Sequence, residues 1–253
     1  MIVVILAGGF GSRLSEETHS IPKPMVEIGK FPILMHLMKY YSKFGHNEFI
    51  VLTGYKSQII ENYFKHIDNV RILLKNDNKV VREDFDYEWD VNLLDTGLES
   101  STAKRIFATK DLIKRSFFMT YGDGLSDIDL DKLLSFHLSK NKIATVTAVR
   151  PPARFGSLEI INDEVTEFRE KSTTNVGYIN GGFFVLNKEV FSYFDDLEDS
   201  FENNVLPKLA RANNFSAFKH DGFWQPMDTL REKEILNNLV INQVAPWMSK
   251  NEY

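Results

Sequence analysis

The sequence predicts an α/β fold with a mixed, mostly parallel central sheet. Three observations support this class. The run from Ile2 to Ala7 is short, apolar and rich in β-branched residues, and it ends in glycines, which is typical of a buried parallel strand followed by a loop. Strand-like and helix-like segments then alternate, as crossover connections require. Short alternating strands follow from Ser157 to Phe184 and indicate a mixed or antiparallel addition to the sheet.

The first half of the chain contains the clearest elements. Apolar residues recur at helical spacing from Pro32 to Phe44 and stop at Gly45, a suitable helix C-cap. We expect a second strand at 48–53 and a second helix at 57–64. The stretch from Val70 to Leu94 is polar and interrupted, so we expect irregular hairpins over the sheet there.

The remaining elements are less sharply patterned. We expect strands at 116–120 and 143–149, with a loop at 121–124, a helix at 130–138 between them, and a stop at Pro151-Pro152. Further along, the expected elements are the strands SLEII, VTEF and YINGGFFVL, helices at 189–194 and 202–213, a compact loop at 224–229, and a last helix at 230–240.

Bulk composition limits the classes of protein. The 253 residues carry a net charge of −5, which disfavours nucleic acid as a partner, and there is no cysteine for a disulfide or a cysteine metal site. The N-terminal apolar run is too short to cross a membrane and does not resemble a signal peptide. We therefore expect a cytoplasmic protein without a membrane partner. We also expect one domain over 1–253, in two halves at about 1–125 and about 126–253.

A glycine-rich loop follows the first strand, in the run Leu6-Ala-Gly-Gly-Phe-Gly-Ser-Arg-Leu14. Glycines let backbone N–H groups approach phosphate oxygens closely. The dinucleotide fingerprint needs a third glycine where Leu14 stands, and the P-loop pattern occurs nowhere in the chain. A nicotinamide-dependent oxidoreductase is thus a poor alternative. A simple turn without a ligand is the structural explanation that competes with phosphate binding.

Two cations accompany this loop. Arg13 lies two residues beyond Gly11, and Lys23 stands between Pro22 and Pro24, which restrict its backbone. An arginine offers a rigid fork and a lysine a compact charge. Each alone would usually be a solvated surface residue. Together, beside a glycine loop, they indicate a triphosphate-binding site.

Two aspartates are candidate ligands for Mg²⁺. Asp123 follows a predicted buried strand in Tyr-Gly-Asp-Gly, and Asp228 precedes the last predicted helix. Structural explanations exist for both, because aspartate next to glycine is common in turns and aspartate is a good helix N-cap. Magnesium bound to a triphosphate takes one or two carboxylates. The sequence alone does not show whether Asp123 and Asp228 meet.

The same residues resemble a family. Leu6-Ala-Gly-Gly-x-Gly-x-Arg-Leu14 followed by Pro22-Lys-Pro-Met25 is similar to the signature of sugar-1-phosphate nucleotidyltransferases. The segments SEET, PMVEIG, TYGDG, INGGFFVLN and GFWQPMDTLR narrow the resemblance to glucose-1-phosphate cytidylyltransferases, over nearly the whole chain. The resemblance implies a Rossmann-like nucleotidyltransferase fold, Mg²⁺ as cofactor, and CTP as donor.

Site residues follow from the resemblance. It implies catalytic roles for Arg13, Lys23 and Asp123, and metal binding by Asp123 and Asp228. The nucleotide would be bound by Leu6, Ala7, Gly8, Gly9, Gly11, Arg13, Lys23, Thr96, Gly97 and Gly122. The acceptor would be bound by Gly156, Glu170, Lys171, Asn180, Gly181 and Trp224.

The chain departs from the family around the acceptor. After Glu170-Lys171 there is no proline and no second lysine, and the segment from Leu98 to Arg105 lacks a glycine pair. A related branch uses L-glutamine phosphate and makes CDP-L-glutamine for phosphoramidate decoration of a bacterial capsule. We rank that acceptor slightly above glucose 1-phosphate, since a site built for one acceptor rejects others. Loop drift without a change of substrate, and a catalytically silent nucleotide-binding homologue, are the alternatives.

Two further expectations concern contacts with other copies of the chain. The resemblance implies a homo-oligomer. Trp247, close to the C-terminus, suggests either a tail that docks on a neighbouring subunit or one that packs on its own chain.

Overall fold

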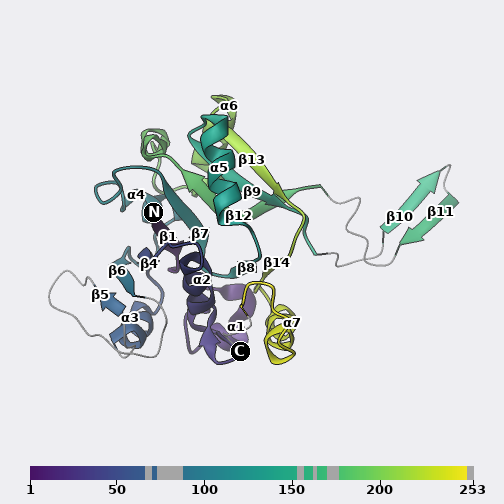
Figure 1. Ribbon diagram of the computed structural model, residues 1–253, viewed down its shortest axis with the longest axis horizontal. Coiled ribbons are helices and arrows are strands. Elements are labelled where there is room, and N and C mark those ends of the chain that lie inside the picture. Colours follow the sequence, from purple (N-terminus) through teal and green to yellow (C-terminus); the bar gives the residue numbers. More distant parts are fainter. Residues whose placement is uncertain (66–69, 73–87, 153–156, 162–163, 170–176, 250–253) are drawn as a thin grey trace.

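The computed structural model describes residues 1–65, 70–72, 88–152, 157–161, 164–169 and 177–249. Eight strands form one sheet in the order β13-β9-β12-β7-β1-β4-β6-β5 (Figure 1). Strand β12 pairs antiparallel with β7 and β9, and the other neighbours in the sheet pair in parallel. The mixed, mostly parallel α/β sheet predicted from the sequence is confirmed.

The strands of the sheet come from both ends of the chain. Their bounds are β1 Ile2–Leu6, β4 Glu48–Thr53, β5 Val70–Ile72, β6 Trp89–Asp95, β7 Phe117–Tyr121, β9 Ala144–Val149, β12 Ile179–Leu186 and β13 Phe215–His220. Smaller two-stranded sheets pair β2 (Glu27–Ile28) with β3 (Phe31–Pro32), β8 (Gly124–Ser126) with β14 (Trp224–Pro226), and β10 (Ser157–Ile161) with β11 (Glu164–Arg169).

Helices cover both faces of the sheet. The α-helices are α1 Ser15–Thr18, α2 Ile33–Ser42, α3 Ser57–Lys65, α4 Thr102–Phe107, α5 Leu130–Lys140, α6 Leu206–Arg211 and α7 Leu230–Ile241. Short 3-10 helices span Ser12–Leu14, Lys23–Met25 and Lys188–Tyr193, and a π-helix spans Phe201–Val205. In the part of the chain that the structure describes, no helix is long and apolar enough to cross a membrane.

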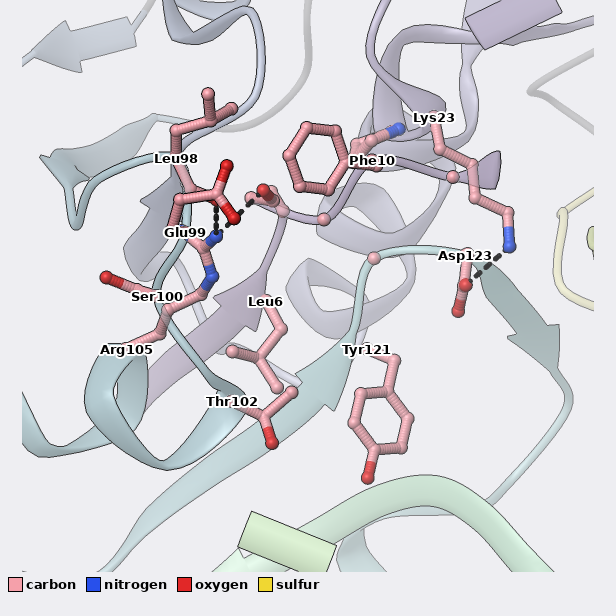
Figure 2. A pocket seen from close by; sticks show the side chains of 16 residues that line it. Leu6, Phe10, Lys23, Leu98, Glu99, Ser100, Thr102, Arg105, Tyr121 and Asp123 are labelled. Carbon is pink, nitrogen blue, oxygen red and sulfur yellow. Dashed lines mark hydrogen bonds and ion pairs between the residues drawn. The ribbon is translucent and has the colours of Figure 1, made fainter. Parts of the chain in front are cut away.

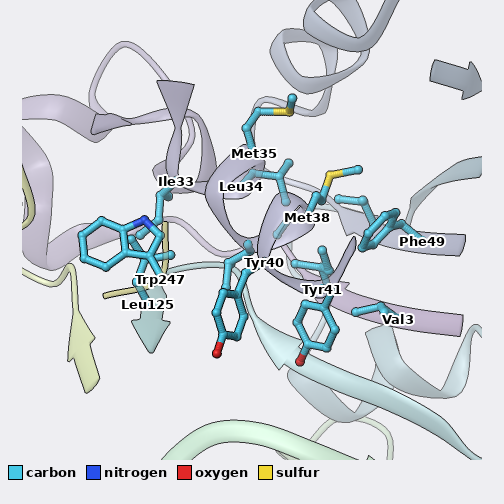
Figure 3. Packing of buried hydrophobic residues seen from close by; sticks show 14 of the residues in the cluster. Val3, Ile33, Leu34, Met35, Met38, Tyr40, Tyr41, Phe49, Leu125 and Trp247 are labelled. Carbon is cyan, nitrogen blue, oxygen red and sulfur yellow. The ribbon is translucent and has the colours of Figure 1, made fainter. Parts of the chain in front are cut away.

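Strand β1 shows why its sequence is continuously apolar. Val3 and Ile5 face one hydrophobic cluster, with α2, while Val4 and Leu6 face the other, with α4 and α6. Both sides of the strand are therefore buried, as expected for a central parallel strand. Figure 3 shows the first cluster, in which Met38 and Tyr41 of α2 lie near Val3.

Several predicted elements need correction. Hairpins were predicted over the stretch 70–94. Residues 73–87 lie outside the described residues, and the two described parts, β5 and β6, are parallel strands of the main sheet. Strand β6 lies near the sheet edge and only part of it is buried, so it lacks the continuous apolar run of a central strand. The predicted helix 202–213 is a π-helix followed by α6, and 189–194 forms a 3-10 helix. Helix α4 and strand β13 were not predicted.

The other predicted elements agree with the structure within a few residues. Strands β1, β4, β7, β9 and β12 and helices α2, α3, α5 and α7 lie where the periodicity places them. Of the short strands expected after residue 157, β12 joins the main sheet, whereas β10 and β11 pair only with each other and lie apart from the sheet in Figure 1. The loop predicted at 224–229 contains the short strand β14.

The C-terminal tryptophan packs on its own chain. Trp247 is 1% exposed, its ring stacks on Phe223 with centroids 5.4 Å apart, and its indole N–H donates to His36 Nδ1 at 3.2 Å. Figure 3 shows Trp247 beside Ile33 at the start of α2. Of the two predicted possibilities for this tail, packing on its own chain is the one that the structure shows.

Candidate active site

The site lies where the parallel strands end. In the sheet, β1 has β4 on one side and β7 on the other, so the chain winds in opposite directions from β1. Ligands of open α/β sheets bind at such switch points, at the carboxyl ends of the strands. The glycine loop follows β1 and Asp123 follows β7. The start of β12 reaches the same edge, because β12 runs antiparallel to β7.

A cavity of about 320 Å³ opens between these loops (Figure 2). Most of the predicted nucleotide-binding residues line it. They are Leu6, Ala7, Gly8, Gly9, Gly11, Lys23 and Gly122, together with Asp123. Of the predicted set, Arg13, Thr96 and Gly97 do not line the cavity. Thr96 lies behind its wall, where its hydroxyl accepts a hydrogen bond from Arg105 at 2.6 Å.

Two glycines are required by close contacts. A Cβ on Gly8 would lie 2.2 Å from Arg105 Nη1, and a Cβ on Gly122 would lie 2.6 Å from the Leu6 carbonyl oxygen. At Gly9 a Cβ would meet nothing within 4 Å. Contact with the Arg105 guanidinium therefore explains Gly8, and contact with the Leu6 backbone explains Gly122, whereas the space beside Gly9 is open.

Arg105 is a functional residue that the sequence analysis missed. Its guanidinium is buried and donates to the carbonyl oxygens of Gly8, Thr53 and Leu98 at 3.0, 3.0 and 3.1 Å. It thus joins the loops that follow β1, β4 and β6, and burial lowers its pKa. The sequence did contain a signal for α4, the helix that carries Arg105. Ser101 is a favourable N-cap residue, and its hydroxyl accepts a hydrogen bond from the Lys104 N–H.

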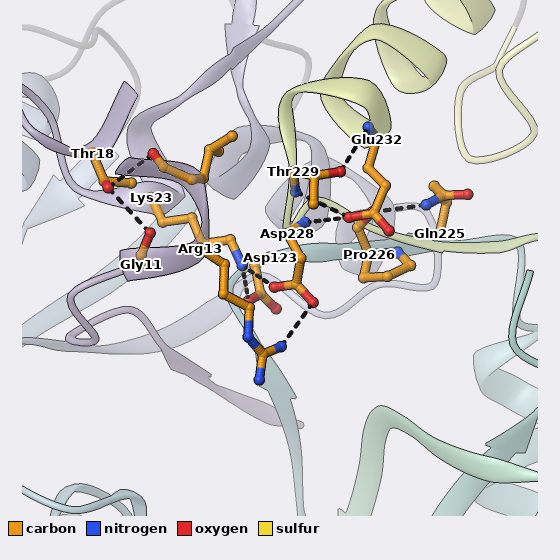
Figure 4. Close-up of polar contacts among 11 residues, drawn as sticks. Gly11, Arg13, Thr18, Lys23, Asp123, Gln225, Pro226, Asp228, Thr229 and Glu232 are labelled. Carbon is orange, nitrogen blue, oxygen red and sulfur yellow. Dashed lines mark hydrogen bonds and ion pairs between the residues drawn. The ribbon is translucent and has the colours of Figure 1, made fainter. Parts of the chain in front are cut away.

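Lys23 lies between the two candidate metal ligands (Figure 4). Its Nζ atom is 2.7 Å from Asp123 Oδ2 and 2.6 Å from Asp228 Oδ1. Arg13 Nη1 lies 3.2 Å from the other oxygen of Asp228. The lysine side chain is 9% exposed and that of Arg13 is 78% exposed. The structure therefore brings together all four charged residues predicted for the donor side.

Local structure explains how these charges meet. Asp123 directly precedes β8, and Asp228 lies two residues after β14, its antiparallel partner. The Met227 N–H also donates to the Asp123 carbonyl at 2.8 Å. The pairing of β8 with β14 thus sets the two carboxylates side by side. Lys23 begins a 3-10 helix between two prolines, and the Met25 N–H donates to the Pro22 carbonyl at 2.8 Å.

Asp228 does not cap the last helix; its neighbour Thr229 does. Thr229 is the N-cap of α7 and forms a capping box with Glu232, whose carboxylate accepts from the N–H groups of Asp228 and Thr229. The carboxylate of Asp228 is therefore free of capping and faces Lys23.

The protonation states of this cluster follow from its charges. Burial acts to lower the pKa of Lys23, but Asp123 and Asp228 outweigh it and hold that pKa above its usual value. Burial acts to raise the pKa of Asp228, but Lys23 and Arg13 hold it below its usual range. The lysine is thus a cation at neutral pH, as electrostatic binding of phosphates requires. Asp228 is an anion, as a ligand of a metal cation must be.

A second, small cavity of about 40 Å³ lies next to Asp123. It is lined by the predicted acceptor residues Asn180, Gly181 and Trp224, and the Trp224 indole N–H donates to the Gly181 carbonyl at 2.7 Å. Tyr121 and Asp123 line both cavities. The other predicted acceptor residues, Gly156, Glu170 and Lys171, lie outside the described residues.

The chain belongs to the nucleotidyl transferase family, which matches residues 2–231. This agrees with the glycine loop, the buried lysine and the paired aspartates. The protein is thus a nucleotidyltransferase of the sugar-1-phosphate type that the sequence resembled.

Particular relatives narrow the comparison. The chain is 45% identical to a glucose-1-phosphate cytidylyltransferase of Salmonella typhimurium, with 98% of each chain covered. It is 41% identical to a probable glucose-1-phosphate cytidylyltransferase of Bacillus subtilis, with 94% of this chain and 96% of the relative covered. Among solved structures, HddC from Yersinia pseudotuberculosis matches with a TM-score of 0.71 at 26% identity, with 94% of this chain and 99% of HddC covered.

Proposed function

We propose that the protein transfers a cytidylyl group from CTP to glucose 1-phosphate and forms CDP-glucose and pyrophosphate. The observation that carries nucleotidyl transfer is the position of Lys23, between Asp123 and Asp228 at the edge of the glycine-loop cavity. The relatives of known name support the choice of CTP and of glucose 1-phosphate. L-glutamine phosphate, the acceptor ranked first from the sequence, receives no support from these relatives.

The proposed reaction needs no covalent intermediate. A phosphate oxygen of the acceptor attacks the α-phosphorus of CTP, the bond between the α-phosphorus and the bridging oxygen breaks, and pyrophosphate leaves with that electron pair. Such a transfer depends on positioning and on neutralisation of phosphate charge. Lys23 is held at the cavity edge in its charged form. The exposed Arg13 is long enough to follow the leaving phosphates.

We further propose that Asp123 and Asp228 hold Mg²⁺. Both carboxylates already bind one cation, the Lys23 ammonium, so their oxygens lie close enough together to share an ion. Two carboxylates plus phosphate oxygens suit the octahedral preference of Mg²⁺. Within the described residues no group of three or more acidic or histidine side chains gathers, so the phosphates would supply further ligands. The bound ion would neutralise phosphate charge beside the lysine.

The acceptor is assigned to the side of Asn180, Gly181 and Trp224. These residues lie next to Asp123, on the opposite side of Tyr121 from the glycine loop. This arrangement supports a position for the acceptor beside the α-phosphate of a nucleotide whose phosphates reach Lys23. The division into a donor half at about 1–125 and an acceptor half at about 126–253, a cytoplasmic location and self-association stay part of the proposal.

A pyrophosphate-release assay tests the proposal. Purified protein with Mg²⁺ is given CTP, UTP, dTTP or GTP, and each nucleotide is paired with glucose 1-phosphate or with L-glutamine phosphate. We expect release with CTP and glucose 1-phosphate. Release with L-glutamine phosphate alone would replace the acceptor, and release with another nucleotide alone would replace the donor. Tight binding of CTP without release from any pair would indicate a silent nucleotide-binding homologue.

A further inference from the structure

Glu202 binds residues that line the two cavities, although it lines neither cavity itself. It lies in the π-helix Phe201–Val205, a rare element that is often found at functional sites. One of its carboxylate oxygens accepts a hydrogen bond from the Tyr121 hydroxyl. The other accepts a hydrogen bond from the Thr102 hydroxyl, with an oxygen–oxygen distance of 2.7 Å. Both of its oxygens are therefore committed to residues of the cavity walls.

Tyr121 forms part of the wall between the two cavities. Figure 2 shows its ring beside Thr102 on one side of the larger cavity. A Cβ on Gly182 would lie 2.5 Å from this ring, and Gly182 has a φ of +78°, so only glycine fits there easily. The ring is thus held between the glycines of β12 and the carboxylate of Glu202.

The direction of the hydrogen bonds links Glu202, through Tyr121, to Asn180 in the smaller cavity. A carboxylate only accepts hydrogen bonds, so Tyr121 must be the donor and uses its single O–H group for Glu202. The phenol oxygen is then left as an acceptor, and the Nδ2 atom of Asn180 donates to it at 3.3 Å. The Asn180 Oδ1 atom accepts from the Gly182 N–H at 2.8 Å. Together these bonds fix which end of the Asn180 amide faces Tyr121, and they leave its second N–H available.

Glu202 also connects to the donor side. Thr102, which accepts from the Phe201 N–H at 2.9 Å, is the first residue of α4. One turn later in this helix, Arg105 binds the carbonyl oxygen of Gly8 in the glycine loop. Helix α4 is thus tied to the glycine loop at one point and to Glu202 at another.

We propose that Glu202 is a positioning residue for the acceptor. It acts through Tyr121 and orients the Asn180 amide so that the free N–H of that amide donates to an oxygen of the acceptor. This role rests on the proposed function, since it assumes that Asn180 faces the acceptor. Glu202 itself does not touch either substrate.

Steady-state kinetics with Glu202→Gln, Tyr121→Phe and the double variant test this role. A glutamine at 202 presents its NH2 group toward one of the two hydroxyl partners. The direction of the hydrogen bonds from residue 202 through Tyr121 to Asn180 is then no longer fixed. We expect the KM for glucose 1-phosphate to rise about tenfold in each single variant, with the KM for CTP and the Tm changed little. Because both changes break one chain, the double variant should be no worse than Tyr121→Phe alone.

Glu198→Gln is the matched control, because Glu198 lies four residues earlier and its side chain is 80% exposed. It should leave both KM values unchanged. Equal increases in the two KM values, independent effects in the double variant, or an unchanged acceptor KM in Tyr121→Phe would each overturn the role of Glu202. Tyr121→Phe keeps the ring in place, so the test survives if Glu202→Gln fails to fold. Absence of turnover by the wild type would instead overturn the proposed function, and the role of Glu202 with it.

Discussion

The Nζ atom of Lys23 lies 2.6 Å from the Oδ1 atom of Asp228, across 205 residues of sequence. Asp123 Oδ2 binds the same ammonium at 2.7 Å. One buried cation thus satisfies two carboxylates that would otherwise repel each other. The predictions below start from this cluster and from the glycine loop beside it.

Lys23→Ala should lower kcat by at least about a hundredfold, the scale of one electrostatic stabiliser of a transition state. The reason is that the ammonium is held in its charged form at the edge of the donor cavity. Pyrophosphate release under saturating substrates measures the effect. The control is Lys188→Ala, which removes an exposed lysine after the far end of β12. Near-normal turnover by Lys23→Ala would remove the lysine from the mechanism.

The apoprotein of Lys23→Ala should bind Mn²⁺ more tightly than the wild type, by at least about fivefold. Hydrogen bonds between charged groups contribute roughly 1.5–3 kcal/mol, and in the wild type a divalent ion must compete with those of Lys23 for Asp123 and Asp228. Electron paramagnetic resonance of free Mn²⁺ gives the affinity without nucleotide. Asp228→Asn should weaken binding, and equal affinity in all three proteins would count against the shared aspartate site.

Gly8→Ala should lower the free energy of unfolding by about 1–3 kcal/mol, the usual range for overpacking. The new Cβ would lie 2.2 Å from Arg105 Nη1, so the guanidinium would have to leave its hydrogen bonds to Gly8, Thr53 and Leu98. Gly9→Ala is the matched control in the same loop, because its Cβ meets nothing within 4 Å. Urea unfolding compares the two, and equal stabilities would show that Arg105 adapts without loss.

Stability should fall as the pH is lowered from about 6.5 to about 4, in part through His46. Burial, and then the N-terminal charge, lower the pKa of this histidine to about 4. The unfolded chain therefore takes up a proton in this window that the folded chain does not, which favours unfolding by at most roughly 3 kcal/mol.

The His46→Gln variant isolates this contribution. Its stability should decline less than that of the wild type between the two pH values, as measured by urea unfolding at each pH. His19→Gln, which removes an exposed histidine, should follow the wild type. Parallel declines in all three proteins would assign the pH dependence to other groups.

The sequence by itself determined the central strands and the chemistry of the donor site. A strand buried on both faces must be apolar throughout, so the run at Ile2–Leu6 was readable without tertiary information. The helical periods of α2 and α7 and the glycine loop were readable for the same reason, since each is a local pattern. The choice of Arg13, Lys23, Asp123 and Asp228 also came from the sequence, first from their positions beside predicted elements and then from the family resemblance.

Only the tertiary structure decided what those residues do together. The pairing of β8 with β14 brings Asp123 and Asp228 to one ammonium, and no local pattern reports a contact across a hundred residues. Strand β6 was misread because it lies next to the edge strand of the sheet, is only partly buried and lacks the apolar signal of a central strand. The buried Arg105 and the half-buried Glu202 were missed because the role of such a charged residue is recognised by its hydrogen-bond partners, and those partners lie on other elements of the fold.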